Sequence, residues 1–165
     1  MRHVSRRLAV ALLVVASLAV SSSAQTSAID KSYFGVWKLN VAKSKYMPGP
    51  GPKESTRTHQ DRGNGFVLVA TDATNAQGVK SHSEYVYKPD GKDYPIAAKG
   101  QGAFLTIDLR TVDAYTVEFT QKADGTAFGT GKRTVSKDGK TMTIETKGTS
   151  QQGQPTSSMA VWEKQ

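Results

Sequence analysis

The chain has 165 residues, with 22 basic residues, 14 acidic residues and no cysteine. The absence of cysteine excludes disulfides, thiolate metal sites, cysteine nucleophiles and a lipidated cysteine anchor. The formal net charge of +8 favours solubility and weak attraction to polyanions, such as acidic envelope polymers, but it does not identify a nucleic-acid partner, and we predict none.

Residues 1–24 have the three-part composition of a secretory signal peptide. Three arginines occur within the first seven residues, 8–20 is an uncharged apolar run, and 22–24 is Ser-Ser-Ala, which offers the small residues that a signal peptidase reads. At about 13 residues the apolar run is too short to span a bilayer of about 30 Å as a helix. A retained membrane anchor is the alternative. We therefore predict a periplasmic or secreted protein with no membrane anchor after cleavage.

Cleavage after Ala24 leaves about one domain's length of chain. We expect a flexible N-terminal lead over 25–32 and a single domain over 33–165. Within that domain glycine follows Asn, Asp or Gln about every dozen residues, and Asn-Gly and Asp-Gly pairs are strong signals of tight hairpin turns. The six pairs are Asn64-Gly65, Gln77-Gly78, Asp90-Gly91, Asp124-Gly125, Asp138-Gly139 and Gln152-Gly153.

The segments between these turns alternate between apolar and polar residues. Leu105, Ile107 and Leu109 share one side of an extended chain, and Thr106 and Asp108 share the other, which is typical of a sheet with one solvated face. About nine or ten strands are predicted, starting near Val36, Thr56, Phe66, Lys80, Tyr94, Phe104, Tyr115, Thr126, Thr141 and Ser158. So many antiparallel strands must close into a barrel or stack as a sandwich.

Two short segments interrupt the strand pattern near the N-terminus of the domain. Residues 40–46 contain the best candidate for a helical turn. The Pro/Gly-rich segment 47–52 has three prolines, each of which lacks a donor and fixes its φ angle. We expect this segment to be an exposed crossover loop near one end of a barrel.

The two ends of the domain carry a family resemblance. Phe34-Gly35-Val36-Trp37-Lys38-Leu39 resembles the opening strand of the lipocalin and fatty-acid-binding protein superfamily, the calycins. Val161-Trp162-Glu163-Lys164 is similar to the closing strand of the fatty-acid-binding branch. The domain also resembles small exported lipocalin-like bacterial proteins of unknown function. The resemblance implies an all-β, antiparallel up-and-down barrel of about eight to ten strands with an internal cavity.

Two departures from the family pattern limit what the resemblance implies. The fatty-acid-binding branch carries a helical hairpin as a lid between its first two strands, whereas 47–52 is too short and rigid for one. That branch holds the lipid carboxylate with an arginine two residues before an aromatic on the closing strand. Ala160 and Trp162 stand at those positions here. The fold and the cavity are therefore carried over, but the fatty acid is not.

Gly35 and Trp37 are predicted to be structural. In calycins the tryptophan plugs one end of the barrel, often beneath a cationic side chain that stacks on its ring. Either Arg133 or Lys164 is a candidate for that cation. Direct contact of Trp37 with a ligand is the alternative.

Seven aromatic residues are candidates for the wall of a ligand cavity, because ligand sites are mostly apolar with a few placed polar groups. They are Tyr85, Tyr87, Phe104, Tyr115, Phe119, Phe128 and Trp162. The alternative is that these side chains fill the barrel solidly, as small barrels allow.

The remaining chemical groups give weaker signals. His82 and Glu84 alternate with Tyr85 and Tyr87, so an acid–base group and a phenol on this strand face opposite ways, and we assign no catalytic residue. His59 and His82 are the only histidines after residue 24 and are interpreted as surface residues, with no metal or cofactor predicted. The glycine-rich segment 125–133 fails the phosphate-loop pattern and is interpreted as a strand.

The basic residues near 47–52 form a predicted rim at the barrel mouth, which guides an anionic ligand or touches acidic envelope polymers; a plain solvated surface is the alternative. They are Lys43, Lys45, Lys53, Arg57 and Arg62.

The function predicted from the sequence is that of an exported, monomeric, non-catalytic binding protein for a small apolar or amphipathic molecule. A structural or envelope-interaction protein with a filled barrel and a basic surface is the first alternative. A small barrel enzyme of the isomerase or decarboxylase type is the second.

Overall fold

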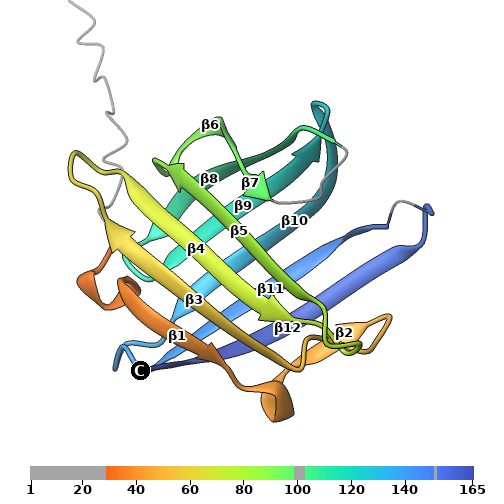
Figure 1. The fold of residues 1–165 in the computed structure, drawn as a ribbon. Coiled ribbons are helices and arrows are strands. Elements are labelled where there is room, and N and C mark those ends of the chain that lie inside the picture. Colours follow the sequence, from red (N-terminus) through yellow and green to blue (C-terminus); the bar gives the residue numbers. More distant parts are fainter. Residues whose placement is uncertain (1–28, 99–102, 151) are drawn as a thin grey trace, which may run out of the picture.

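The computed structural model describes residues 29–98, 103–150 and 152–165, so the predicted signal peptide lies outside the described residues. The described chain forms one nearly closed antiparallel barrel (Figure 1). Two 3₁₀ turns, η1 and η2, accompany the strands, and no helix among the described residues is long and apolar enough to cross a membrane.

The elements follow one another along the chain as η1 (Lys31–Tyr33), β1 (Gly35–Leu39), η2 (Val41–Lys43), β2 (Lys45–Met47), β3 (Glu54–Asp61), β4 (Val67–Thr74), β5 (Lys80–Tyr87), β6 (Asp90–Pro95), β7 (Ala97–Ala98), β8 (Leu105–Asp113), β9 (Thr116–Ala123), β10 (Thr126–Val135), β11 (Thr141–Thr149) and β12 (Pro155–Lys164). A strand lies at or beside each of the predicted starts, although the strand expected from near Tyr94 begins earlier, at Asp90. The structure adds the short strands β2 and β7, whose three and two residues are too few for an alternating pattern.

The strand order is β6-β8-β9-β10-β11-β12-β1-β3-β4-β5-β7, with β2 paired to β12. Because β1 pairs with both β12 and β3, the two ends of the chain close the barrel. The remaining seam lies between β5 and β8. It is bridged by β6, β7 and Ile96, whose N–H donates to the carbonyl of Leu105 at 2.9 Å.

The predicted turn glycines all adopt positive φ angles, which glycine tolerates without strain. One of them differs in role from the prediction. Asp90 and Gly91 form the start of β6, where the register with β8 shifts, and a bend at Pro89 separates them from β5.

We call the end at which β1 begins and β12 ends the closed end, and the opposite end the mouth; they lie at the left and right of Figure 1. Residues 29–32 differ from the predicted flexible lead. The N–H of Asp30 donates to the carbonyl of Ala114 at 2.8 Å, the carboxylate of Asp30 caps η1, and Ile29 packs against the core. The buried ring of Tyr33 follows, so this segment covers the closed end.

Trp37 is fully buried just inside that cover. Its indole N–H donates to the carbonyl of Tyr33 at 3.3 Å, and the ammonium of Lys164 lies 5.1 Å from the centre of its ring. Lys164 also donates to the carbonyl of Ser32 at 2.8 Å. Of the two cations considered for this position, Lys164 occupies it. Gly35 has a φ of +124°, and a Cβ there would lie 3.0 Å from the side chain of Lys164.

Candidate ligand site in the barrel interior

A cavity of about 250 Å³ lies inside the barrel. It is enclosed by side chains from six of the long strands and from the β6–β7 bridge. They are Arg57, Ser83, Tyr85, Ile96, Ala98, Leu105, Phe119, Gln121, Arg133, Ile144 and Thr146. The polar residues Ser83, Gln121 and Thr146 lie nearer the mouth than the other cavity residues of their strands, which are Tyr85, Phe119 and Ile144.

Arg133 is the most unusual residue of this cavity. Its position on β10 shares a face with Val135, so the alternation of the strand sends a guanidinium into the core, where only 2% of the residue is exposed. Nη2 donates a hydrogen bond to the hydroxyl of Tyr85. The guanidinium carbon lies 5.0 Å from the ring centre of Phe119, while Nε and Nη1 have no hydrogen-bond partner.

Arg57 brings a second guanidinium to the same cavity. On β3 it alternates in phase with the buried Ser55 and His59, so it points inward and is half-buried. Its Nε donates to Thr71 Oγ1 at 3.0 Å, and its guanidinium carbon lies 5.6 Å from the ring of Trp162. Burial lowers the pKa of Arg57, and the neighbouring charge of Arg133 lowers that pKa further.

Neither arginine has an acidic partner. All 14 aspartates and glutamates of the chain fall within the described residues, and none forms an ion pair with Arg57 or Arg133. A buried charge is normally paired, because removing an ion from water costs several kcal/mol. Cation–π contacts of about 0.5–2 kcal/mol offset only part of that cost. The cavity therefore carries uncompensated positive charge.

His59 and Tyr87 are further buried polar side chains that lie toward the closed end. His59 is 1% exposed, its ring lies 4.7 Å from that of Tyr33, and neither ring nitrogen has a hydrogen-bond partner. Burial holds the pKa of His59 well below its usual range, and the charges of Arg57 and Arg133 add to this effect. Burial likewise raises the pKa of Tyr87 well above its usual range. The interpretation of His59 as a surface residue is wrong, because the residue is buried.

The structure divides the seven predicted wall aromatics. Tyr85, Tyr87, Phe119 and Trp162 are buried in the core, and two of them, Tyr85 and Phe119, line the cavity. The other three are elsewhere: Tyr115 is half-buried in the β8–β9 turn, and Phe104 and Phe128 are 63% and 37% exposed near the mouth. Phe104 and Phe128 lie near the ends of their strands, where alternation no longer dictates the direction of a side chain.

The predicted basic rim is dispersed. Lys43, Lys45 and Lys53 are exposed near the mouth, and Lys43 pairs with Glu163 at 3.0 Å. Arg62 follows the end of β3 at the closed end, and Arg57 points inside. Sequence proximity to the proline loop was thus a poor guide, whereas the alternation Ser55, Arg57, His59 on one strand would have placed Arg57 correctly.

The strand with the acid–base candidates has the predicted two faces. Tyr85 and Tyr87 are buried, whereas His82 and Glu84 are exposed, and His82 Nδ1 lies 2.8 Å from Asp72 Oδ1. Within the described residues, no group of three or more His, Asp or Glu side chains has the geometry to hold a metal ion.

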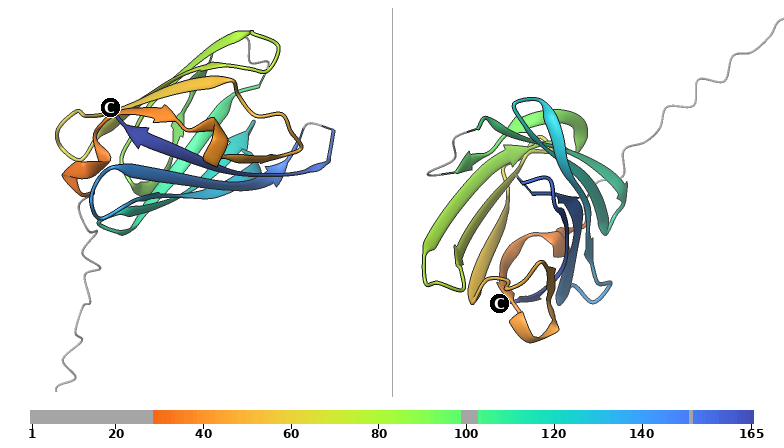
Figure 2. Two further views of the ribbon diagram at one scale, coloured as in Figure 1. Left: turned by 90° about the horizontal axis from the view of Figure 1, so that it is seen from below. Right: turned by 90° about the vertical axis from the view of Figure 1, so that its right-hand side faces the viewer.

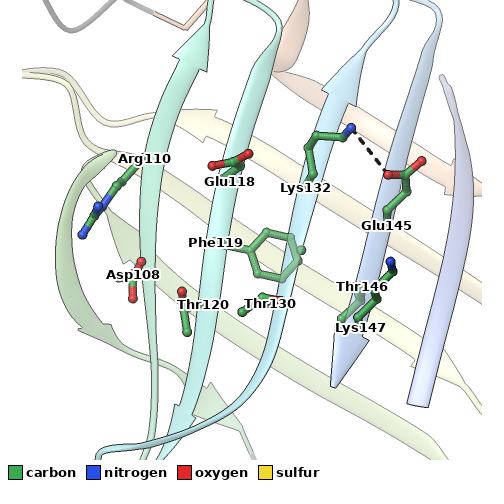
Figure 3. A pocket seen from close by; sticks show the side chains of 11 residues that line it. Asp108, Arg110, Glu118, Phe119, Thr120, Thr130, Lys132, Glu145, Thr146 and Lys147 are labelled. Carbon is green, nitrogen blue, oxygen red and sulfur yellow. Dashed lines mark ion pairs between the residues drawn. The ribbon is translucent and has the colours of Figure 1, made fainter. Parts of the chain in front are cut away.

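A larger hollow of about 510 Å³ lies on the outer face of β8–β11 (Figure 3). Its charged side chains alternate in sign across neighbouring strands, from Arg110 opposite Glu118 to Lys132 opposite Glu145, whose Nζ and Oε2 are 3.6 Å apart. The charges here are balanced on a solvated sheet face, unlike those of the interior cavity.

Together the closed sheet, the tryptophan plug and the internal cavity define a calycin-type barrel of the fatty-acid-binding-protein kind. Among solved structures, a variant of the fluorescent protein UnaG is similar, with a TM-score of 0.54 over 81% of this chain and 96% of the UnaG chain. At 13% sequence identity this similarity establishes the fold alone. No protein-family model matches the sequence, and no curated protein is recognisably similar to it.

Proposed function

We propose that this protein is a non-catalytic binding protein for a small amphipathic anion, whose negative group contacts Arg133 and Arg57 inside the barrel. The observation that carries the proposal is the guanidinium of Arg133, which is almost completely buried, has two nitrogens without partners and lacks an acidic neighbour. An anion in the cavity supplies the compensating charge, and hydrogen bonds between ions are the strong ones.

The rest of the lining favours an amphipathic ligand. Ile96, Leu105, Phe119 and Ile144 offer apolar surface beside the two guanidinium groups. The cavity of about 250 Å³ lies just below the range of about 300–1,000 Å³ that is usual for ligand pockets. A compact carboxylate, sulfonate or phosphate with a hydrophobic body therefore fits better than a long acyl chain.

Fluorescence titration with two naphthalene dyes tests this proposal. Anilinonaphthalene sulfonate carries a negative charge, and N-phenylnaphthylamine is a neutral molecule of similar shape. Replacing Arg133 by Met removes a charged hydrogen-bond donor worth about 1.5–3 kcal/mol, which corresponds to a loss of sulfonate affinity of about tenfold or more. The neutral dye should bind Arg133→Met as well as it binds the wild type.

Arg62→Met is the matched control, because it removes an exposed arginine from the closed end. It should leave the binding of both dyes unchanged. Equal sulfonate affinity in the wild type and Arg133→Met would contradict the proposed site.

The filled barrel with a structural role is the second candidate, and the small size of the cavity favours it. In that case neither dye enters the barrel, and truncation of Phe119 lowers stability without changing any binding. The two candidates therefore give opposite results in the same titration.

We also propose that the protein is exported. The support is the composition of residues 1–24, with its arginines, apolar run and Ser-Ser-Ala. N-terminal sequencing of the protein recovered from its host should begin at Gln25. An intact N-terminus on protein found in the cytoplasm would contradict export.

A further inference from the structure

The β3–β4 turn, residues 62–66, lies at the closed end and contains Asn64-Gly65. This is the only Asn-Gly pair in the chain, because the other two asparagines, Asn40 and Asn75, precede valine and alanine. Residues 62–65 are all exposed. Figure 2 shows the turn, in yellow, at the closed end beside η1, in orange (left view).

The fold leaves this pair chemically accessible. Two hydrogen bonds of 2.9 Å close the turn, from the N–H of Arg62 to the carbonyl of Phe66 and from the N–H of Phe66 to the carbonyl of Gly63. Asn64 and Gly65 lie between them with φ angles of +52° and +78°, in the left-handed region that both residue types tolerate. Within the described residues, neither the side-chain amide of Asn64 nor the N–H of Gly65 forms a hydrogen bond.

The other two asparagines are held by hydrogen bonds. Asn40 Nδ2 donates to Glu163 Oε1 at 2.8 Å, and Asn40 Oδ1 accepts from the N–H of Lys43 at 3.0 Å. Asn75 Oδ1 accepts from two backbone N–H groups, at 3.0 Å and 2.9 Å. Turning either side chain onto the following backbone nitrogen would break these bonds, and each lost bond costs free energy. Asn64 has no such restraint.

We propose that Asn64 is a site of spontaneous deamidation in the folded protein. The backbone nitrogen of Gly65 loses its proton and attacks Cγ of Asn64, so that a C–N bond forms, the Cγ–Nδ2 bond breaks and ammonia leaves with the proton. Water then opens the cyclic imide at either carbonyl, and the products are aspartate and isoaspartate. The attack is intramolecular and needs no enzyme. Glycine favours it because no side chain covers the attacking nitrogen.

Deamidation changes the chemistry of a hollow on the outside of the closed end. Asn64, Phe66 and Lys88 line this hollow of about 470 Å³ together with Ile29 and Phe34. The ammonium of Lys88 lies 4.4 Å from the centre of the Phe66 ring. Both products replace a neutral amide by a carboxylate here, and isoaspartate also lengthens the backbone of the turn by a carbon atom. The reaction leaves the interior cavity and its arginines unchanged, so it is independent of ligand binding.

Peptide mapping of the purified protein, after incubation in its folded state, tests this proposal. Trypsin releases 63–80 as one peptide that contains both Asn64 and Asn75, so one fragmentation spectrum compares the two sites. We expect Asn64 to deamidate at least about tenfold faster than Asn75 or Asn40, and to give isoaspartate together with aspartate. The rate should be higher at alkaline than at neutral pH, because the attacking nitrogen must lose a proton.

Gly65→Ala and Gly63→Ala are matched variants on the two sides of Asn64. The two glycines have φ angles of +78° and +75°, and an added Cβ meets nothing within 4 Å at either position. Gly65→Ala should slow deamidation about tenfold, because its methyl group hinders the attacking nitrogen, whereas Gly63→Ala should stay within about twofold of the wild type. Thermal melts confirm that both variants are folded.

Three results would overturn the proposal. The first is a rate at Asn64 no higher than the rate at Asn75 in the folded wild type. The second is a product at Asn64 without isoaspartate, because direct hydrolysis of the amide gives aspartate alone. The third is an equal rate in Gly65→Ala and Gly63→Ala, which would show that the Gly65 nitrogen does not attack.

Discussion

Trp37 and Arg133 are both almost completely buried, but their surroundings differ. Trp37 has a hydrogen-bond acceptor in the carbonyl of Tyr33 and a stacked cation in Lys164. Arg133 has one phenol, two aromatic faces and no counter-charge. The surroundings of Trp37 thus satisfy its polar group within the chain, whereas the guanidinium of Arg133 needs a counter-charge from outside the chain.

This difference in surroundings distinguishes a residue that stabilises the fold from a residue that is suited to bind a ligand. A site whose polar groups are all satisfied internally can only lose free energy when it is altered. A site that buries an unpaired charge reduces stability in the empty protein and regains it when a ligand binds. Substitutions of Trp37 and of Arg133 should therefore change the free energy of unfolding in opposite directions.

The largest expected effect is at the closed end. Trp37→Ala should lower the free energy of unfolding by about 3–5 kcal/mol, because a large buried ring leaves a cavity that the plug cannot refill. Urea denaturation measures this change. Phe104→Ala, which truncates an exposed aromatic, is the control and should stay within about 0.5 kcal/mol of the wild type. A loss below 1 kcal/mol for Trp37→Ala would show that it is not a plug.

Gly131→Ala tests how tightly the wall beside the cavity is packed. A Cβ at this position would overlap with Cζ of Phe119 and with the backbone carbonyl oxygen of Glu145. We expect a loss of about 1–3 kcal/mol from overpacking. Thr130→Ala, one residue away and exposed, is the control in the same denaturation experiment, and equal stability of the two variants would refute the close contact.

Arg133→Met should have the opposite sign. Removing the unpaired charge should raise the stability of the empty protein by about 1–2 kcal/mol, after the lost hydrogen bond to Tyr85 is taken into account. Chemical denaturation of delipidated protein provides the measurement. Destabilisation by more than 1 kcal/mol would mean that Arg133 is held by interactions within the barrel and that the proposed contrast is wrong.

The smallest effect is a pH dependence from His59. Its pKa is lowered in the folded barrel, chiefly by burial, so between about pH 6.5 and the folded pKa the unfolded chain binds a proton that the folded chain does not. Stability should therefore be complete above pH 7 and fall by about 1 kcal/mol between pH 7 and pH 5.5. His59→Gln should flatten this profile and His82→Ala, at an exposed position, should not. A profile unchanged by His59→Gln would exclude the assignment.

Much of this fold could be predicted from local patterns. Period-two alternation located ten strands, and the Gly-x-Trp opening with the Val-Trp-Glu-Lys closing strand indicated a calycin barrel. These features are encoded within a few residues of one another. Strands β2 and β7 were missed because two or three residues carry no periodicity.

The candidate site was harder to predict because it is assembled from distant strands. Arg57 and Arg133 lie 76 positions apart, and each alone resembles a surface charge. Only the closed barrel places both in one cavity with Tyr85 and Phe119. The family resemblance placed the expected carboxylate-binding arginine on the closing strand, where this chain has Ala160. The buried arginine is instead Arg133 on β10.

Native mass spectrometry of the protein purified gently from its own type of host tests the central claim most directly. We predict that the wild type carries a small anionic adduct that leaves on denaturation, and that Arg133→Met purified in parallel carries none. An adduct that persists on Arg133→Met, or a bare mass for the wild type, would contradict the claim that the buried arginine holds a ligand.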